Sequence, residues 1–342
     1  MTDSFRSPLV SVVMPVYNGA AFVAQAIESV LSQTLKEFSL IIIDDGSTDN
    51  TLEILSKFEE QDKRIQILRQ SPNQGIVVAL NLGCQAATGK YIARMDADDI
   101  MLPKRLEKQI AHLDAHPNIG ILGTAISFID EKGDITGQNI YPQTASFVRW
   151  SMMFYNGLAH PSVMMRRGII ASLGFYHQTP AEDFDLWMRA LMITDIDNLP
   201  DILLLYRLSP NSIVAKTGAS LLHDSSIHIQ KTISALLQRD IALSDVQKIW
   251  IFSSRSFISQ EEIKNTARLI IDIYHAYIKL YSFPKNEKQH ITYNAASKLF
   301  ALCADALKYS PQLAVDLFLK GWRFAPLSPF ITLLTAISRR IR

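Results

Sequence analysis

Short apolar runs alternate with helix-like spacings of apolar residues over the first 130 positions of the chain. Runs rich in β-branched residues predict buried strands at 9–17, at 38–51 where the run passes into acidic and glycine turn residues, at 64–70 and at 90–96. Apolar residues three or four positions apart predict a helix after each strand. Strands separated by helices form βαβ units, so the pattern predicts an α/β fold with a mainly parallel sheet flanked by helices.

Residues that favour helix starts support two of these helices. Asn18 has the short polar side chain of an N-cap, and it precedes a helix in which Phe22, Ala26 and Val30 recur four apart. Pro103 precedes the fourth apolar helical pattern, and proline is favoured at the first position of a helix. We therefore expect Asn18 to cap the first helix and Pro103 to open the fourth.

The pattern changes from about residue 226 onward. Strand signals are absent there, and helical patterns follow one another at 226–239, 260–283, 294–309 and 311–323. A chain of 342 residues is long enough for a domain of about 230 residues and a smaller second one. The sequence therefore predicts an α/β domain over 1–225 and an all-helical region over 226–342.

The composition is that of an ordinary globular protein, with 48% hydrophobic and 20% charged residues. The net charge of +1 gives the whole molecule no electrostatic reason to bind nucleic acid. Cys84 and Cys303 lie in apolar helical patterns, which favours buried free thiols in a reducing compartment over a disulfide. There is no signal-peptide pattern and no run of about 20 apolar residues that could span a bilayer. We expect a cytoplasmic protein, or one attached to the inner face of the cell membrane.

Acidic and turn residues gather where three predicted strands end, at Pro15-Val16-Tyr17, Asp44-Asp45-Gly46 and Asp96 to Asp99. Ligands of parallel α/β sheets bind in the crevice outside the carboxyl ends of the strands. Asp96 and Asp98 are two positions apart in an extended segment, so their carboxylates point to the same side. Oxygen ligands at this spacing suit Mg²⁺ or Mn²⁺, and the alternative is a solvated acidic turn.

The middle acidic segment has two compatible interpretations. Asp44 and Asp45 lie at the end of a predicted buried strand, at the edge of the sheet, and Gly46 allows a tight turn after them. Residues 47–49 have the side chains of helix caps and suit the start of the next helix. Capping accounts for the residues after the glycine, but it does not account for the two carboxylates before it.

Four segments in this order resemble glycosyltransferase family 2: "VSVVMPVYNGAAFVAQAIESVLSQTLKEFSLIIIDDGSTDNT", "NQGIVVALNLGCQAATGKYIARMDADD", "HPSVMMRR" and "AEDFDLWMR". The resemblance covers roughly residues 9 to 210. It implies the GT-A fold, a Rossmann-like sheet that binds a nucleotide-sugar donor. Within the family, the chain is similar to enzymes that assemble bacterial surface polysaccharides.

The resemblance implies a nucleotide pocket at the first two strand ends. Pro15, Val16 and Tyr17 match the segment that lines this pocket, with Tyr17 against the base. Asp45 matches the aspartate that contacts the uracil edge.

The resemblance also implies a metal site and a general base. Asp96, Ala97 and Asp98 match the D-x-D segment that engages the metal and the donor diphosphate, and Asp99 is a further candidate ligand. Asp183 matches the aspartate of the E-D motif, the base that deprotonates the acceptor hydroxyl. Such enzymes invert the anomeric centre by one in-line displacement. The alternative for this last segment is the start of an amphipathic helix, whose N-terminal end favours acidic residues.

Other polar residues have alternatives that the sequence leaves open. His160 could bind the metal or a donor phosphate, or could be a hydrogen-bonded core histidine. Arg166 and Arg167 could contact the diphosphate or lie on the surface. Arg207 could help to close the site or form a surface salt bridge. Arg94 lies one strand period before Asp96, so we expect it to neutralise the acidic group as a buried partner.

The chain departs from the family at one position. Many relatives carry an arginine before the asparagine of the second segment, where this chain has Leu80 before Asn81. Between residues 70 and 89 there is no basic residue. The diphosphate charge must therefore be balanced by the metal, by helix N–H groups or by basic residues from elsewhere.

The last segment, 321–342, combines aromatic and aliphatic residues with four arginines. It could form a helix that lies on an anionic membrane surface near a lipid-linked acceptor. The alternative is a last helix that packs on the protein and ends in a solvated basic tail.

The sequence therefore favours an inverting, metal-dependent glycosyltransferase. It would move a sugar from a nucleotide donor, a UDP-sugar, to an oligosaccharide or lipid-linked glycan acceptor. A catalytically inactive nucleotide-sugar binding module is one alternative. A nucleotidyltransferase is another, although "PVYNGAAFVAQ" lacks the glycine-rich and basic loop that such enzymes carry after the first strand.

Overall fold

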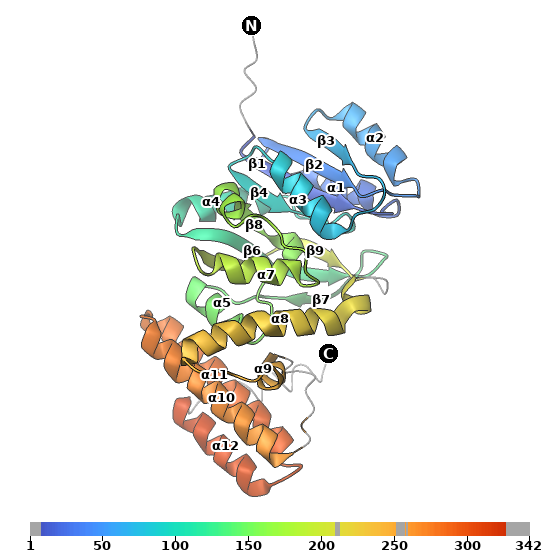
Figure 1. Ribbon diagram of the computed structural model, residues 1–342. Coiled ribbons are helices and arrows are strands. Elements are labelled where there is room, and N and C mark those ends of the chain that lie inside the picture. Colours follow the sequence, from blue (N-terminus) through green and yellow to red (C-terminus); the bar gives the residue numbers. More distant parts are fainter. Residues whose placement is uncertain (1–7, 209–212, 251–256, 258, 326–342) are drawn as a thin grey trace. The chain divides into compact units, whose positions relative to one another are not determined.

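The computed structural model describes residues 8–208, 213–250, 257 and 259–325, which belong to two compact units (Figure 1). The first unit comprises the chain up to 148 together with 156–221, and the second comprises 149–155 together with the chain from 222 onward. The division after Leu221 lies close to the boundary that the sequence pattern puts after residue 225. The sequence pattern does not predict that residues 149–155 belong to the second unit.

The first unit is built on one sheet, which has nine strands within the described residues. Its order is β3-β2-β1-β4-β8-β6-β9-β5, and β7 pairs with β6. The strands are β1 Val10–Val16, β2 Phe38–Asp44, β3 Ile65–Arg69, β4 Tyr91–Arg94, β5 Ile100–Met101, β6 Ile119–Ile129, β7 Ile135–Asn139, β8 Met164–Arg166 and β9 Asp195–Arg207. The first four pair in parallel, as predicted. Strand β8 runs antiparallel to β4 and β6, so the sheet becomes mixed in its second half.

Helices cover both faces of the parallel half of the sheet. The helices of this unit are α1 Val23–Leu31, α2 Thr51–Gln61, α3 Ile76–Ala86, α4 Arg105–Ala115, α5 Ala145–Ser151, α6 Arg167–Ser172 and α7 Glu182–Ala190, and α8 Ile213–Leu237 follows. Val12 of β1 shares one core cluster with residues of α1 and α4. Its neighbour Val13 points to the opposite face and packs closely against Gly83 of α3. A Cβ added to this glycine would lie only 2.5 Å from Val13 Cγ1. Because β1 is covered on both faces, all seven of its residues are buried.

Two predicted helix starts are wrong. Helix α1 begins at Val23 and not directly after Asn18, because Asn18 has a φ of 52° and its side chain accepts a hydrogen bond from the Thr48 N–H. Helix α4 begins at Arg105, and Pro103 lies in the turn before it. The Pro103 carbonyl accepts the Thr34 N–H at 2.9 Å, so this turn is anchored to the end of α1 rather than to its own helix.

The second unit is helical, as predicted. After α8 it contains α9 Leu243–Trp250, α10 Gln260–Leu280, α11 Lys285–Ala306 and α12 Pro311–Phe324. Ser259 and Ser310 cap α10 and α12 by accepting backbone N–H groups from their first turns. Trp150, from the segment 149–155, is completely buried in this unit and donates a 2.8 Å hydrogen bond to Asn294. A tryptophan that fills a core and satisfies its N–H explains why this short segment belongs to the second unit.

Two further expectations are confirmed. Cys84 and Cys303 are free thiols, the first buried and the second half-buried. In the part of the chain that the structure describes, no helix is both long and apolar enough to cross a bilayer.

Candidate functional site

The carboxyl ends of β1, β2 and β4 meet at one edge of the sheet. Val16 at the end of β1 pairs with Asp44 at the end of β2, and Met95 after β4 donates its N–H to the Val13 carbonyl. The loop after β1 is tied to the loop after β2 by a 2.9 Å bond from the Asn18 N–H to Ser47 Oγ. The three segments singled out from the sequence therefore converge on one edge.

The loop after β1 also reaches the D-x-D segment. Gly19 in this loop lies close to Ala97, since a Cβ added to the glycine would be 3.9 Å from the Ala97 Cβ. Pro15 and Val16 are buried beneath this loop, whereas Tyr17 is 52% exposed at the rim. An exposed aromatic ring beside a buried strand end has the surface that stacking on a nucleotide base requires.

Asp45 anchors a loop on the other side of the rim. Its two carboxylate oxygens accept the N–H groups of Gln74 and Gly75, each at 2.8 Å. Gly75 has a φ of 91°, a conformation that glycine adopts without strain. Asp45 therefore holds the turn before α3, in addition to any contact with a base.

Arg94 neutralises the acidic segment, as predicted. It is buried, and its Nη1 lies 2.5 Å from Asp96 Oδ2. Burial, and then the Asp96 charge, raise the pKa of Asp98 to about 6. The charges of Arg94 and Arg207 oppose this rise, so the raised pKa reflects above all the cost of burying the Asp98 carboxylate.

Asp99 points into the protein and is only 1% exposed. Its Oδ1 accepts the Arg207 N–H at 2.8 Å, and among the described residues no donor reaches its Oδ2. Burial, and then the charges of Asp96 and Asp98, raise the pKa of Asp99 well above its ordinary value. A buried oxygen without a donor is costly unless a proton or a cation satisfies it.

Arg207 braces the acidic segment from β9. Its guanidinium donates to the Asp98 carbonyl, the Asp130 carbonyl and Gln25 Oε1, each at 2.8 Å, and lies 4.3 Å from the centre of the Phe22 ring. Arg207 is buried, so the alternative of a surface salt bridge is wrong. Its bond to the Asp98 backbone fixes the turn that carries the carboxylates.

Asp183 lies in the first turn of α7. Its Oδ2 accepts the Asn156 Nδ2 amide at 2.9 Å, and its Oδ1 accepts the Phe184 N–H at 2.7 Å. Burial raises the pKa of Asp183. Burial, and then the Asp183 charge, raise the pKa of the adjacent Glu182 to about 7.

The positive charge of Arg94 acts on carboxylates of both the D-x-D segment and α7. Burial raises the pKa values of Asp98, Glu182 and Asp183, and the positive charge of Arg94 opposes that rise at all three. The Asp96 charge also contributes to the raised pKa of Glu182. Charges act on one another in this way over short distances in a poorly solvated region. Arg94 therefore influences carboxylates of both motifs, although Asp98 and Asp183 are 85 residues apart in the chain.

His160 is buried close to Glu182. Its Nε2 lies 2.9 Å from the Tyr176 hydroxyl, and its Nδ1 lies 3.8 Å from Glu182 Oε1. Burial, and then the Arg94 charge, hold the pKa of His160 well below its ordinary value. These contacts fit the alternative of a neutral, hydrogen-bonded core histidine.

The structure does not bring Arg166 or Arg167 to the carboxylates. Arg166 pairs with Tyr91 at the start of β4, whereas the acidic segment follows the end of that strand. Its guanidinium donates to the carbonyls of Leu113 and Ile119, and that of Arg167 donates to the Gly89 carbonyl. The expectation that Arg166 binds the donor diphosphate is therefore contradicted, because its donors are engaged at the opposite edge of the sheet.

Sequence reasoning missed Asn156, which contacts Asp183, and Tyr206 of β9. Burial, and then the Asp96 charge, raise the pKa of Tyr206. Leu80, at the position where many relatives have arginine, is completely buried and adds no cation. The neighbouring Asn81 bonds to both the N–H and the carbonyl of Tyr176.

The residues at this edge fit a divalent cation. Within the described ranges, no group of three or more histidine, cysteine or acidic side chains is arranged as a complete metal cage. Mg²⁺ and Mn²⁺ do not require one, since they commonly bind one or two carboxylates together with substrate phosphates. The carboxylates of Asp96 and Asp98, which follow the end of β4, supply such a partial donor set.

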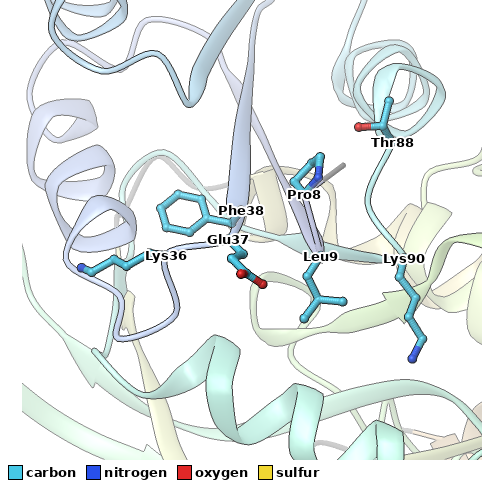
Figure 2. A pocket seen from close by; sticks show the side chains of 7 residues that line it. All are labelled: Pro8, Leu9, Lys36, Glu37, Phe38, Thr88 and Lys90. Carbon is cyan, nitrogen blue, oxygen red and sulfur yellow. The ribbon is translucent and has the colours of Figure 1, made fainter. Parts of the chain in front are cut away.

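A hollow of about 450 Å³ lies at the opposite edge of the sheet (Figure 2). It is lined by residues that precede β1, β2 and β4, among them Leu9, Glu37 and Lys90. Lys90 is paired with Asp114 at 2.6 Å. This hollow therefore lies away from the acidic segment and is not the candidate site.

Comparison with known proteins identifies the family. The model of "Glycosyl transferase family 2" matches residues 11–173. The O-antigen biosynthesis glycosyltransferase WbnJ of Escherichia coli is 35% identical over 211 residues, which cover 60% of this chain and 81% of that protein.

Solved structures agree on the fold. S. aureus TarS 1–349 in complex with UDP-GlcNAc superposes with a TM-score of 0.57 at 17% identity, over 92% of this chain and 91% of that one. A mannosyltransferase from Pyrobaculum calidifontis, in complex with GDP-Man and Mn²⁺, gives a TM-score of 0.53 at 16% identity, over 96% of this chain and 88% of that one. The predicted GT-A fold with a C-terminal helical region is confirmed. With the family model and a relative of this coverage in agreement, the chain belongs to glycosyltransferase family 2.

Proposed function

We propose that this glycosyltransferase inverts the anomeric centre and depends on Mg²⁺ or Mn²⁺. It moves a hexosyl or N-acetylhexosaminyl group from a UDP-sugar to a hydroxyl of a growing surface polysaccharide or lipid-linked glycan. The observation that carries this proposal is the convergence of the three acidic and turn segments at one edge of the sheet, where Arg94 pairs with Asp96. The similarity to an O-antigen enzyme supports the acceptor class, and the UDP-GlcNAc complex of TarS supports the donor class.

The acidic segment is proposed to bind the donor diphosphate. Asp96 and Asp98 would hold the divalent cation, with the buried Asp99 behind them as a further candidate ligand whose Oδ2 has no donor among the described residues. When bound, such a cation supplies Lewis-acid stabilisation of the negative charge that develops on the leaving diphosphate. Arg207 keeps the segment in place through the Asp98 backbone. Tyr17 stacks on the base at the rim, and Asp45 contacts its edge.

Asp183 is proposed to be the general base. Burial raises its pKa, which makes the carboxylate a stronger base than an ordinary aspartate. As the acceptor oxygen attacks the anomeric carbon, its proton moves to a carboxylate oxygen of Asp183 and the bond to the diphosphate breaks. Attack on the face opposite the diphosphate inverts the configuration.

A panel of nucleotide sugars tests the donor class. In the presence of Mn²⁺, the correct donor at about 100 times its Kd should stabilise the protein by about 2.7 kcal/mol, because it binds only the folded state. Thermal unfolding with UDP-, GDP- and dTDP-sugars measures this. Stabilisation by a GDP-sugar alone would contradict the UDP assignment.

The released product separates the remaining alternatives. A glycosyltransferase releases a nucleoside diphosphate, and slow donor hydrolysis is measurable even without the acceptor. A nucleotidyltransferase would release pyrophosphate. An inactive binding module would be stabilised by the donor and show no turnover at all.

We also propose that α12 lies on an anionic membrane surface, near a lipid-linked acceptor. One side of this helix packs inward through Leu313 and Leu317. Another side exposes an apolar stripe at helical spacing, consisting of Val315, Phe318, Leu319 and Trp322. Arg323 and Lys320 lie beside the stripe, and Lys320 pairs with Asp316 at 2.7 Å. Basic residues beside an exposed apolar stripe are typical of interfacial helices. The basic segment that follows, residues 326–342, lies outside the described residues.

Vesicle flotation tests this surface. The protein should float with vesicles that contain phosphatidylglycerol and less with pure phosphatidylcholine. Leu319→Glu with Trp322→Glu should weaken binding at least about tenfold, because two large side chains lose their burial in the bilayer. Met192→Glu is a matched control, since Met192 is an exposed apolar residue of the first unit. Equal flotation of the double variant and the parent would contradict the proposal.

A further inference from the structure

We propose that Asn156 is a positioning residue for Asp183: its side-chain amide fixes the orientation of the carboxylate that accepts the proton. This inference rests on the proposed role of Asp183 as the general base. It assigns a function to a residue that the sequence motifs do not include.

The contact is made by a side chain whose orientation is defined. Asn156 Nδ2 donates to Asp183 Oδ2 at 2.9 Å. Asn156 Oδ1 accepts the Leu158 N–H at 3.3 Å, so the amide cannot rotate by 180° without losing both bonds. Asp183 Oδ1 accepts the Phe184 N–H at 2.7 Å. Two donors therefore fix both oxygens of the carboxylate.

The turn that carries Asn156 is itself held from the sheet. Asn198 of β9 is only 2% exposed, and its Nδ2 donates to the carbonyls of Gly157 at 3.0 Å and Pro142 at 2.8 Å. Asn156 and Asp183 are 27 residues apart in the chain, so only the tertiary structure brings them together. A donor on a rigid turn positions a catalytic group better than one on a mobile chain.

The chemistry suits a neutral donor. The charged and titratable groups that act on Asp183 and its neighbour Glu182 are Arg94 on β4, Tyr176 before the helix, His160, whose Nδ1 lies 3.8 Å from Glu182 Oε1, and Asp96, whose charge acts on Glu182. Burial raises the pKa of Asp183, and the bonds from Phe184 and Asn156 and the charge of Arg94 oppose this rise. A second cation in place of the amide would lower the pKa further and weaken the base. An amide orients the carboxylate and keeps most of its basicity.

Asn156→Ala tests the inference. Because a hydrogen bond to a charged group is stronger than one between neutral groups, its loss should lower kcat roughly 10- to 100-fold at pH 7.5. The KM for the sugar donor should stay within about twofold of the parent value. The acidic limb of the pH–rate profile should move up by about one unit, because the ionised carboxylate loses a donor. Circular dichroism and donor-induced thermal stabilisation with Mn²⁺ show that the fold and the donor site are intact.

Asn118→Ala is the matched control. Asn118 Nδ2 donates to Asp195 Oδ2 at 2.9 Å, the same type of bond at an exposed position away from the site. This variant should retain the parent kcat and pH profile. A parent-like pH profile in Asn156→Ala, with or without lower activity, would overturn the inference, because a purely structural residue would not change the acidic limb. If Asp183→Asn remains active, Asp183 is not the general base. That result would contradict the proposed function itself, whereas the pH profile of Asn156→Ala tests only the role of Asn156.

Discussion

Asp183→Asn is expected to lower the rate of sugar transfer by about 10²- to 10⁴-fold, the usual contribution of a general base. Asparagine has nearly the same shape, and the Phe184 N–H can still bond to its side-chain oxygen, while its amide nitrogen takes the place of the oxygen that accepts from Asn156. It cannot accept a proton at neutral pH. Because the change removes the base and leaves the metal-binding carboxylates in place, donor binding with Mn²⁺ should persist. Initial rates and donor-induced thermal stabilisation measure the two effects separately.

The pH dependence of the parent follows from the same residue. Asp183 works as a base only when ionised, and burial raises its pKa above the ordinary value. Activity should therefore fall as the pH is lowered through this raised pKa, at a higher pH than an exposed aspartate would give. Asp201→Asn is a suitable control, because Asp201 forms a half-exposed ion pair with Lys108. Transfer by Asp183→Asn within tenfold of the parent rate would exclude the assigned role.

The parallel half of the sheet could be predicted because its signals are local. Each of β1 to β4 is a short apolar run, and a helical spacing follows each of them. The second half could not be predicted in the same way. β6 is as apolar as β1, but its parallel partner β9 lies about 70 residues later, and no turn or helix pattern indicates that pairing. Residues 149–155 similarly join the second unit through Trp150, whose partner Asn294 is 144 residues away.

The candidate site shows the same distinction. The ion pair of Arg94 and Asp96 follows from the two-residue period of an extended chain, and the structure contains it. The position of Arg166 depends on the direction of β8, which the sequence pattern does not predict. β8 runs antiparallel to β4, so the chain moves away from the acidic edge as it passes from His160 to Arg166. Asn156 and Arg207 act through hydrogen bonds between distant segments, for which the sequence carries no periodic signal.

Asp98→Asn should have two opposite effects, and the first is on transfer. Loss of a metal-binding carboxylate removes stabilisation of the leaving diphosphate, which is worth several kcal/mol. The rate should therefore fall by about 10³-fold. Stabilisation of the folded protein by Mn²⁺ with UDP should disappear as well, and thermal unfolding with and without these ligands measures it.

The second effect is on the stability of the protein without divalent ions. Burial, and then the Asp96 charge, raise the pKa of Asp98 to about 6 from its ordinary value near 3.8. Between these two values the folded state binds more protons than the unfolded state, so this carboxyl makes the parent less stable as the pH rises through that window. Asparagine has no proton to lose. At pH 7.5 in EDTA, the free energy of unfolding of Asp98→Asn should therefore exceed that of the parent by about 1 to 3 kcal/mol. At pH 4 the difference should be close to zero.

Urea unfolding at both pH values measures this difference, and Asp114→Asn provides a control of opposite sign. Hydrogen bonds from Lys90 and Tyr91 lower the pKa of Asp114, so its carboxylate stabilises the folded state at neutral pH and asparagine should not. If Asp98→Asn is less stable than the parent at pH 7.5 in EDTA, the ionised Asp98 carboxylate is well satisfied by the protein alone. The acidic segment would then have no unfavourable buried charge for a cation to relieve, and the metal-binding role would lose its physical basis. If Asp98→Asn is instead more stable than the parent but inactive, the Asp98 carboxylate destabilises the folded protein and is needed for sugar transfer.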